Sequence, residues 1–166
     1  MNLTQAWAWR PDIYDDFAAL RTQLSGASAL SKRELAVMVC AGASELRDAY
    51  CSLAWGRTLA KDGGAPLAAA ILQGNVEADA TPRELALARW ARRVVADPNA
   101  TTAADVQALR DAGLGGREIF EATVWVAFRQ AFSTVNAALG VAPDAQLAAA
   151  APTEVRAAVD YGRPPA

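Results

Sequence analysis

Apolar residues recur at helical spacing along almost the whole chain. Near the N-terminus, one such stripe consists of Ile13, Phe17, Leu20 and Leu24. The stripe predicts an amphipathic helix over residues 11–24, which begins at Pro11 in a first-turn position. No segment shows the sustained alternation of apolar and polar residues that is typical of a half-buried strand, so the pattern predicts helices only.

Capping residues mark where several of these helices begin. Serine or threonine is followed three residues later by an acidic residue at Ser31/Glu34, Thr81/Glu84 and Thr102/Asp105. Such pairs cap the first turn of a helix, and Pro82 adds the proline that is favoured at the first helical position. The helices predicted in this part of the chain span about 31–43, 50–61, 66–72, 82–96 and 102–112.

The segment from about residue 116 to 139 is predicted to be a long and unusually apolar helix that ends at Gly140. Its apolar positions include Ile119, Val124, Phe128, Phe132 and Val135. A helix this apolar lies at the centre of a bundle or packs against another subunit. Arg129 and Gln130 interrupt the apolar run. They can reach either a ligand or a neighbouring subunit, and we expect the latter.

These elements predict an all-α fold, a single domain of about six to eight helices that spans residues 1–166. Its core covers about residues 10–145. The tail, over about residues 146–166, holds a short helix and a proline-rich end that we expect to fray. The chain shows no internal repeat and no domain boundary.

Composition and charge exclude several classes of function. The chain of 166 residues has a net charge of −2 with basic and acidic residues interleaved, so we expect no nucleic-acid partner. It has no uncharged apolar run of about 18 residues and no signal-peptide pattern, so we expect no membrane partner and a cytoplasmic location. The two cysteines, Cys40 and Cys51, are too few for a disulfide framework.

The absence of histidine restricts the chemistry more than any other count. It excludes a Ser-His-Asp triad, a Cys-His pair and a histidine-ligated metal, and two cysteines exclude a four-cysteine zinc site. No glycine-rich phosphate loop follows a strand. The sequence therefore implies no cofactor and no metal.

The order of the segments resembles the AhpD-like superfamily, which contains the alkyl hydroperoxidase AhpD and the carboxymuconolactone decarboxylases. "LSKRELAVMVCAGASELRDAYCSLAWG" is similar to the helix pair of that family, and the stretch from "TPRELALARWARRVVADPN" to "FSTVNAALGV" is similar to the C-terminal half of its peroxidase-related branch. The resemblance covers about residues 10–145. It implies an AhpD-like helical domain and a homo-oligomer, often a trimer or a hexamer.

The catalytic pattern of that family, Cys-x-x-Cys-x-x-x-His, is matched only in part. In active relatives the two cysteines form a disulfide while they reduce peroxide, and a glutamate and a histidine carry protons. The second cysteine falls on Cys51, whereas the first falls on Asp48. The histidine falls on Trp55 and the glutamate on Ala36, with Glu34 two residues out of register. Three of the four groups are therefore replaced, and no disulfide can join positions 48 and 51.

Cys51 has two interpretations. As a working thiol it lies at the third position of a helix capped by Asp48, whose carboxylate binds its backbone N–H. The helix N-terminus and Arg47 favour the thiolate, whereas Asp48 and Glu45 raise the pKa of the thiol. As a packing residue it is buried like a small hydrophobe, which is the interpretation that we adopt for Cys40.

The aromatic neighbours of Cys51 also have two interpretations. Trp55 is one helical turn further on, so both side chains share a face. Its indole either fills the space of the imidazole and closes the pocket, or lines an apolar cavity for a planar ligand. Tyr50 is interpreted as a pocket wall, because an ordinary pKa of about 10 makes it a poor base.

Three functions remain open, and with them the question of whether the chain is an enzyme. The first is an antioxidant thiol oxidoreductase in which Cys51, beside Asp48, reduces hydroperoxides and an outside thiol restores it. The second is a catalytically altered member that binds a small molecule or a protein partner. The third is a decarboxylase- or lyase-like enzyme for a small carboxylated substrate, with its acid and anion site among Asp48, Glu45, Arg47 and Arg57.

The expected oligomer needs apolar surface. The long helix from residue 116 and the aromatic residues Trp7, Trp9 and Trp125 are compatible with buried interfaces between subunits.

Overall fold

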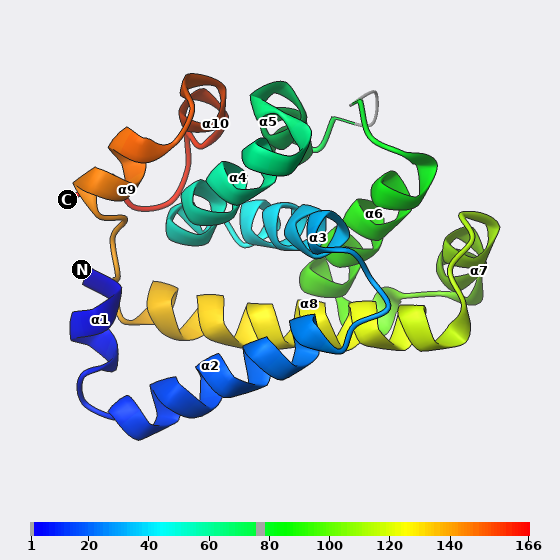
Figure 1. Ribbon diagram of the computed structural model, residues 1–166, viewed down its shortest axis with the longest axis horizontal. Coiled ribbons are helices and arrows are strands. Elements are labelled where there is room, and N and C mark those ends of the chain that lie inside the picture. Colours follow the sequence, from blue (N-terminus) through cyan, green and yellow to red (C-terminus); the bar gives the residue numbers. More distant parts are fainter. Residues whose placement is uncertain (1, 76–78) are drawn as a thin grey trace.

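Helix α3, Lys32–Glu45, lies at the centre of the fold. In the computed structural model, which describes residues 2–75 and 79–166, it packs against α4 (Ala49–Gly63), α5 (Ala65–Gln73), α6 (Pro82–Ala96) and α8 (Gly116–Ala138) (Figure 1). Its fully buried side chains include Ala36, Val37, Cys40 and Ala41. Because these side chains are small, four helices can approach the axis of α3 closely, and the main hydrophobic core forms around it.

The remaining helices surround this centre. They are α1 (Asn2–Trp7), α2 (Pro11–Gly26), the 3-10 helix η1 (Pro98–Ala100), α7 (Ala103–Asp111), α9 (Ala145–Ala150) and α10 (Thr153–Ala158). The described ranges contain no strand, which confirms the predicted all-α fold. They contain ten α-helices rather than six to eight, because the pattern predicted neither α1 nor a second helix in the tail.

The three predicted capping pairs are confirmed. Ser31/Glu34, Thr81/Glu84 and Thr102/Asp105 form reciprocal hydrogen bonds at the starts of α3, α6 and α7. In each pair the hydroxyl accepts the backbone N–H of the acidic residue, whose carboxylate accepts the N–H of the capping residue. Each pair fixes the residue at which its helix begins. The start of the helix in turn determines which of its side chains face the core.

Helix α8 runs along one side of the molecule, with α2 beside it (Figure 1). Its buried residues are Ala122, Trp125, Val126, Arg129, Ser133 and Asn136, which share one helix face. No α2 side chain is fully buried. Partly buried aromatic contacts hold α2 instead, such as the stack of Phe17 on Phe128, with 5.5 Å between ring centroids.

The C-terminal tail folds back toward the start of α4. Val155 of α10 is fully buried, and the backbone N–H of Ala166 donates to the Pro143 carbonyl at 2.9 Å. Gly162 has a φ of 74°, and a Cβ there would come within 2.5 Å of the Arg47 carbonyl oxygen. The end of the chain, which was expected to fray, therefore makes close backbone contacts.

Arg83 of α6 joins three helices. Its guanidinium binds the Glu34 carboxylate of α3 at 2.5 Å, the Glu118 carboxylate of α8, and the Gly113 carbonyl oxygen at 2.9 Å. Burial acts to raise the pKa of Glu34, but the Ser31 N–H and Arg83 hold it below its ordinary value. Arg83 also lowers the pKa of Glu118. The ion pairs thus contribute stability that depends on pH.

Replacing Arg83 with methionine is expected to lower the free energy of unfolding by about 2–3 kcal/mol at neutral pH, because two carboxylates lose a charged partner. Both acids have folded-state pKa values below their unfolded values. Their stabilisation is therefore present above the unfolded pKa and is lost as the pH falls through the folded pKa. Urea unfolding should show that the difference in free energy of unfolding between wild type and Arg83→Met is smaller in acid than at neutral pH. If the difference is the same at neutral and acidic pH, the stabilisation is not ionic.

Candidate functional site

A tight turn between α3 and α4 places the first residue of the site. Arg47 has a left-handed backbone (φ 56°), and its N–H donates to the Ser44 carbonyl at 3.0 Å. The Asp48 N–H donates to the Ala43 carbonyl at 2.8 Å. This is a Schellman ending, which usually employs glycine, so Arg47 costs about 1 kcal/mol of backbone strain. The turn brings Asp48 directly to the start of α4.

Asp48 is the N-cap of α4, as the sequence predicted. Its Oδ1 atom accepts the backbone N–H of Cys51 at 3.0 Å, and the residue is 6% exposed. The second carboxylate oxygen, Oδ2, is buried without a hydrogen-bond partner. A buried acceptor without a partner costs free energy, so this oxygen is available to a proton donor that comes within reach.

Two side chains from α8 reach the sulfur of Cys51. The Ser133 Oγ lies 3.4 Å and the Arg129 Nη2 lies 3.6 Å from Sγ, and both groups donate to it. They are four residues apart on the buried face of α8, so they lie one turn from each other. Cys51 is 2% exposed. The sulfur is therefore enclosed and faces two donors.

Arg129 packs against two aromatic rings. Its guanidinium carbon lies 5.1 Å from the ring centroid of Trp55 and 5.1 Å from that of Phe132. The residue is 7% exposed, and its Nε has no hydrogen-bond partner. None of the ion pairs found in residues 2–75 and 79–166 includes Arg129. A buried cation without a paired carboxylate is costly, which makes Arg129 a candidate functional residue.

The surroundings of Cys51 keep its thiol protonated. Burial raises the pKa of the Cys51 thiol to about 12, and the negative charge of Asp48 acts in the same direction, against Arg129 and Ser133. The raised pKa makes the thiolate rare at neutral pH. From the sequence alone, the direction of the shift in the pKa of Cys51 could not be predicted. In the structure, burial has the largest effect and raises that pKa.

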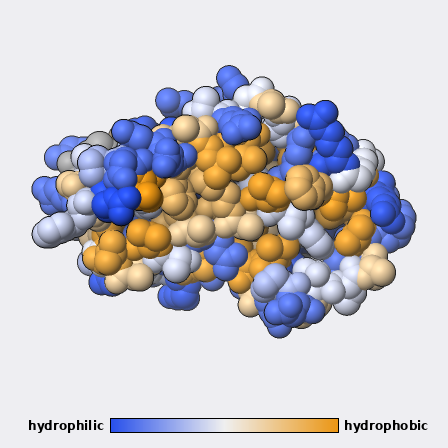
Figure 2. All heavy atoms as spheres, turned by 90° about the horizontal axis from the view of Figure 1, so that it is seen from below, coloured by the Kyte–Doolittle hydropathy of each residue, from blue (hydrophilic) through white to orange (hydrophobic). Residues whose placement is uncertain are grey.

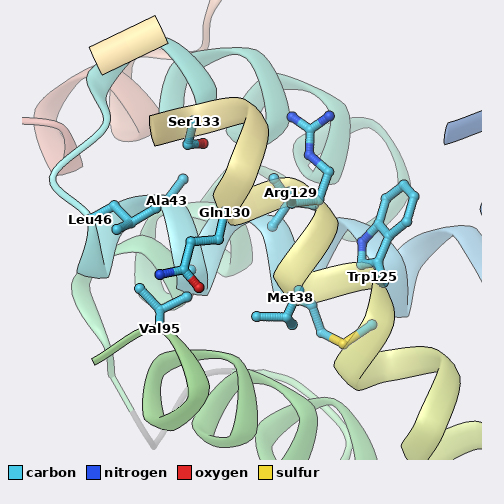
Figure 3. A pocket seen from close by; sticks show the side chains of 11 residues that line it. Met38, Ala43, Leu46, Val95, Trp125, Arg129, Gln130 and Ser133 are labelled. Carbon is cyan, nitrogen blue, oxygen red and sulfur yellow. The ribbon is translucent and has the colours of Figure 1, made fainter. Parts of the chain in front are cut away.

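A narrow hollow lies beside this group, between α3, α6 and α8 (Figure 3). Its volume is about 10 Å³, which is room for one water-sized molecule, and its apolar wall includes Met38 and Leu46. The Arg129 and Gln130 side chains extend to opposite sides of α8, and Gln130 turns toward Val95 (Figure 3). Arg129, which was expected to reach a neighbouring subunit, instead contacts the thiol of its own chain.

An aromatic disulfide reagent is expected to label native Cys51 at least about 100-fold more slowly than it labels the urea-unfolded chain, because only an accessible thiolate reacts. Cys40 is buried as well, and burial raises its pKa. Labelling of Cys40→Ala, followed by absorbance, reports on Cys51 alone. Rapid labelling of this variant in native buffer, with circular dichroism unchanged, would contradict the buried placement.

Tyr50 does not act on the thiol. It is 7% exposed, and its hydroxyl donates to Asp144 Oδ2 at 3.1 Å. Burial raises the pKa of Tyr50 above its ordinary value, and the bond to Asp144 adds to this. The side chain therefore serves packing, and it also lines a separate surface hollow with Arg47, Asp48 and Arg163.

Glu45 and Arg47 do not line the Cys51 site, contrary to expectation. Both are exposed, because the end of α3 turns them outward. Glu45 pairs with Arg92 at 3.3 Å, and the Arg47 guanidinium lies 5.7 Å from the ring centroid of Tyr161. Arg47 does line the separate surface hollow, together with Asp48, Tyr50 and Arg163.

Trp55 occupies the α4 side of the site. Its ring packs edge-on against Trp125 at 6.0 Å between centroids, and Arg129 lies over it. Ala36, at the position of the relay glutamate, is fully buried and carries no proton-transfer group. An indole and a methyl group therefore occupy the two positions at which the resemblance leads us to expect proton-transfer groups.

Of the three tryptophans that we considered for subunit interfaces, Trp7 and Trp125 are buried within the chain and Trp9 is exposed. Trp125 is 2% exposed, and its Nε1–H donates to the Leu35 carbonyl at 3.1 Å. Trp7 is also buried, and it donates to Asn136 at 2.7 Å. Both lie inside their own chain, whereas Trp9 is 89% exposed.

The sequence pattern did not point to Ser133, and it predicted a different placement for Arg129. A signal was present, because the two are polar residues four positions apart in a helix with many large apolar residues. Such spacing puts both on one face, and polar residues on a buried face need a partner. The partner, Cys51, lies 82 residues from Ser133 in sequence and could be identified only from the fold.

The described part of the chain contains no group of three or more His, Cys, Asp or Glu residues that could hold a metal ion. No helix in the same residues is long and apolar enough to cross a membrane.

Comparisons with solved structures identify similar folds. A crystal structure of an alkylhydroperoxidase AhpD core, an uncharacterized peroxidase-related protein from Ralstonia eutropha JMP134, matches with a TM-score of 0.80 and 25% identity, over 88% of this chain and 78% of that one. An uncharacterized peroxidase-related protein from Silicibacter sp. TM1040 matches with a TM-score of 0.79 and 23% identity, over 86% and 75%. No protein-family model and no curated protein matches the sequence.

Proposed function

We propose that this chain, which belongs to the AhpD-like superfamily, is a thiol oxidoreductase that reduces hydroperoxides through the single cysteine Cys51. The observation that carries the proposal is the set of groups around one sulfur. Arg129 and Ser133 donate to Sγ, and the unpartnered carboxylate oxygen of Asp48 belongs to the residue that caps the same turn of helix. Nucleophile, base and donors are thus supplied without histidine.

Each group has a distinct role in the proposal. Asp48 takes the thiol proton as the sulfur attacks, which avoids the rare free thiolate. Arg129 stabilises the negative charge that develops on sulfur and on the departing oxygen, and Ser133 orients the sulfur. This set takes the place of the glutamate, the histidine and the second cysteine of the family motif.

The reaction balances with one thiol and one outside reductant. The sulfur of Cys51 attacks one peroxide oxygen, the O–O bond breaks, and the thiol is oxidised to a sulfenic acid while the hydroperoxide is reduced to an alcohol. The proton held by Asp48 passes to the departing oxygen. Two molecules of a small thiol then reduce the sulfenic acid, with release of water and of their disulfide.

Consumption of hydrogen peroxide and of an organic hydroperoxide tests the proposal. Wild type should react faster than free cysteine at the same pH. A sulfenic-acid trap should label Cys51 when the protein is unfolded in its presence directly after the reaction. Cys51→Ser should be inert, whereas Cys40→Ala, the matched control, should keep the wild-type rate. If wild type and Cys51→Ser consume peroxide equally slowly, the proposal is wrong.

A second candidate is a member of the family that binds a ligand and does no thiol chemistry. The specific observation in its favour is the burial of Cys51, which is 2% exposed and has a pKa raised to about 12. In this case the thiol packs as a small hydrophobe, and Arg129 is retained to bind an anion. Inert Cys51 together with measurable ligand binding would favour this candidate.

We also propose that copies of the chain associate through α8. Large apolar side chains are exposed on this helix, namely Phe120 at 69% and Val135 at 36%, and so is Leu139 directly after its end, at 66%. Figure 2 views the side on which α2 and α8 lie, and hydrophobic residues form a band across it. Exposed apolar bands of this kind mark association surfaces. Light scattering coupled to size exclusion should give a mass above 17.4 kDa, and a monomer would refute this part of the proposal.

A further inference from the structure

A second hollow lies on the opposite side of Arg129, between α2 and α8. Its volume is about 20 Å³, and it is lined by Tyr14, Phe17, Ala18, Arg21, Phe128, Arg129 and Phe132. Four of these side chains are aromatic, and two are guanidinium groups. No acidic residue lines it. The hollow thus combines two cations with apolar walls.

Neither cation is neutralised by the protein. In the part of the chain that the structure describes, no ion pair includes Arg21 or Arg129. Burial lowers the pKa of Arg129, and the positive charge of Arg21 acts in the same direction, against the thiol and Asp48. The Arg129 Nε is buried without a partner. The buried Arg129 guanidinium has no ion-pair partner among the described residues, so an anion from outside would stabilise it, and the exposed Arg21 adds a second positive charge at the same hollow.

We propose that Arg21 and Arg129 form a binding site for the carboxylate of a small organic acid with an apolar, flat body. The guanidinium groups hold the carboxylate, and the body lies against Tyr14 and Phe17 at the mouth. Arginine is suited to this task because its planar fork matches a carboxylate, and the aromatic walls exclude water. The site goes beyond the proposed thiol chemistry, since binding does not require Cys51 to react.

Helix α2 is built so that it can admit such a ligand. A volume of about 20 Å³ holds the head of the acid but not its body. No side chain of α2 is fully buried, and the helix meets α8 through stacked rings such as Phe17 on Phe128. A small outward shift of α2 breaks few contacts, and a ring from the ligand can replace those that are lost.

Ligand-observed fluorine NMR with 4-fluorobenzoate tests the site, and 4-fluorobenzamide is the uncharged control. We expect 4-fluorobenzoate to bind, and 4-fluorobenzamide to bind at least about tenfold more weakly. Arg21→Gln should weaken benzoate binding about ten- to hundredfold, because one charged partner is lost. Arg21 is exposed on α2, so this variant should fold. Arg110→Gln, an exposed arginine on α7, is the matched control and should bind like wild type.

The outcome does not depend on the peroxidase proposal. Cys51→Ser should still bind 4-fluorobenzoate although it consumes no peroxide, so failure of one proposal is distinguished from failure of the other. Equal binding of benzoate and benzamide, or benzoate binding that is unaffected by Arg21→Gln, would overturn the site. If inorganic phosphate displaces 4-fluorobenzoate at similar concentrations, the site binds anions in general, and the proposed preference for an apolar, flat body is wrong.

Discussion

Asp48→Asn should slow the reaction of Cys51 with hydroperoxide by about 10²–10⁴-fold, the usual contribution of a positioned general base. The substitution keeps the N-cap, because asparagine caps a helix about as well as aspartate and can still accept the Cys51 N–H. It removes the carboxylate oxygen that is buried without a partner. The free energy of unfolding should therefore change little while the rate falls. Stopped-flow peroxide consumption and urea unfolding measure the two quantities.

The sign of this effect separates two mechanisms. Burial and the charge of Asp48 both raise the pKa of Cys51, so removal of the charge lowers that pKa and increases the thiolate fraction. If a pre-formed thiolate were the reacting species, Asp48→Asn would accelerate the reaction, and the wild-type rate would rise about tenfold per pH unit between neutral and mildly alkaline pH. General-base catalysis predicts a slower variant and a wild-type rate that is nearly constant between neutral and mildly alkaline pH.

Arg129→Met should reduce the rate of peroxide consumption by about 10²–10³-fold, because the cation that stabilises the developing charge is lost. The same substitution should leave the free energy of unfolding unchanged or raise it by up to about 2 kcal/mol. Replacing a buried, unpaired charge with an apolar side chain of similar length removes a desolvation penalty, which offsets the lost contacts with Trp55 and Phe132. Opposite effects on stability and rate identify a residue retained for function.

Arg129→Lys is the matched control. It keeps the charge but loses the planar fork, so its rate should lie between those of wild type and Arg129→Met. A large loss of stability in Arg129→Met, without a specific loss of rate, would show that Arg129 serves packing. Thermal unfolding by circular dichroism, beside the kinetic assay, decides between these outcomes.

Local signals in the sequence determined the helices. Ser31 with Glu34 and Thr81 with Glu84 cap helices because a hydroxyl and a carboxylate within one turn can satisfy each other's backbone donors. Asp48 caps α4 for the same local reason, which is why its bond to Cys51 could be predicted. The short helix α1 and one of the two tail helices, α9 and α10, were missed because six residues carry too little periodicity to reveal a helix.

The sequence by itself determined the all-α fold and the position of Cys51 behind its N-cap, because capping and helical periodicity act over three or four residues. Only the tertiary structure decided what surrounds the sulfur. Arg129 and Ser133 lie 78 and 82 residues away, and they meet Cys51 because α8 packs its buried face along α3 and toward α4. The same packing excludes water from the thiol and raises its pKa. Burial is a property of the whole assembly of helices, so the protonation state of Cys51 was decided by the fold.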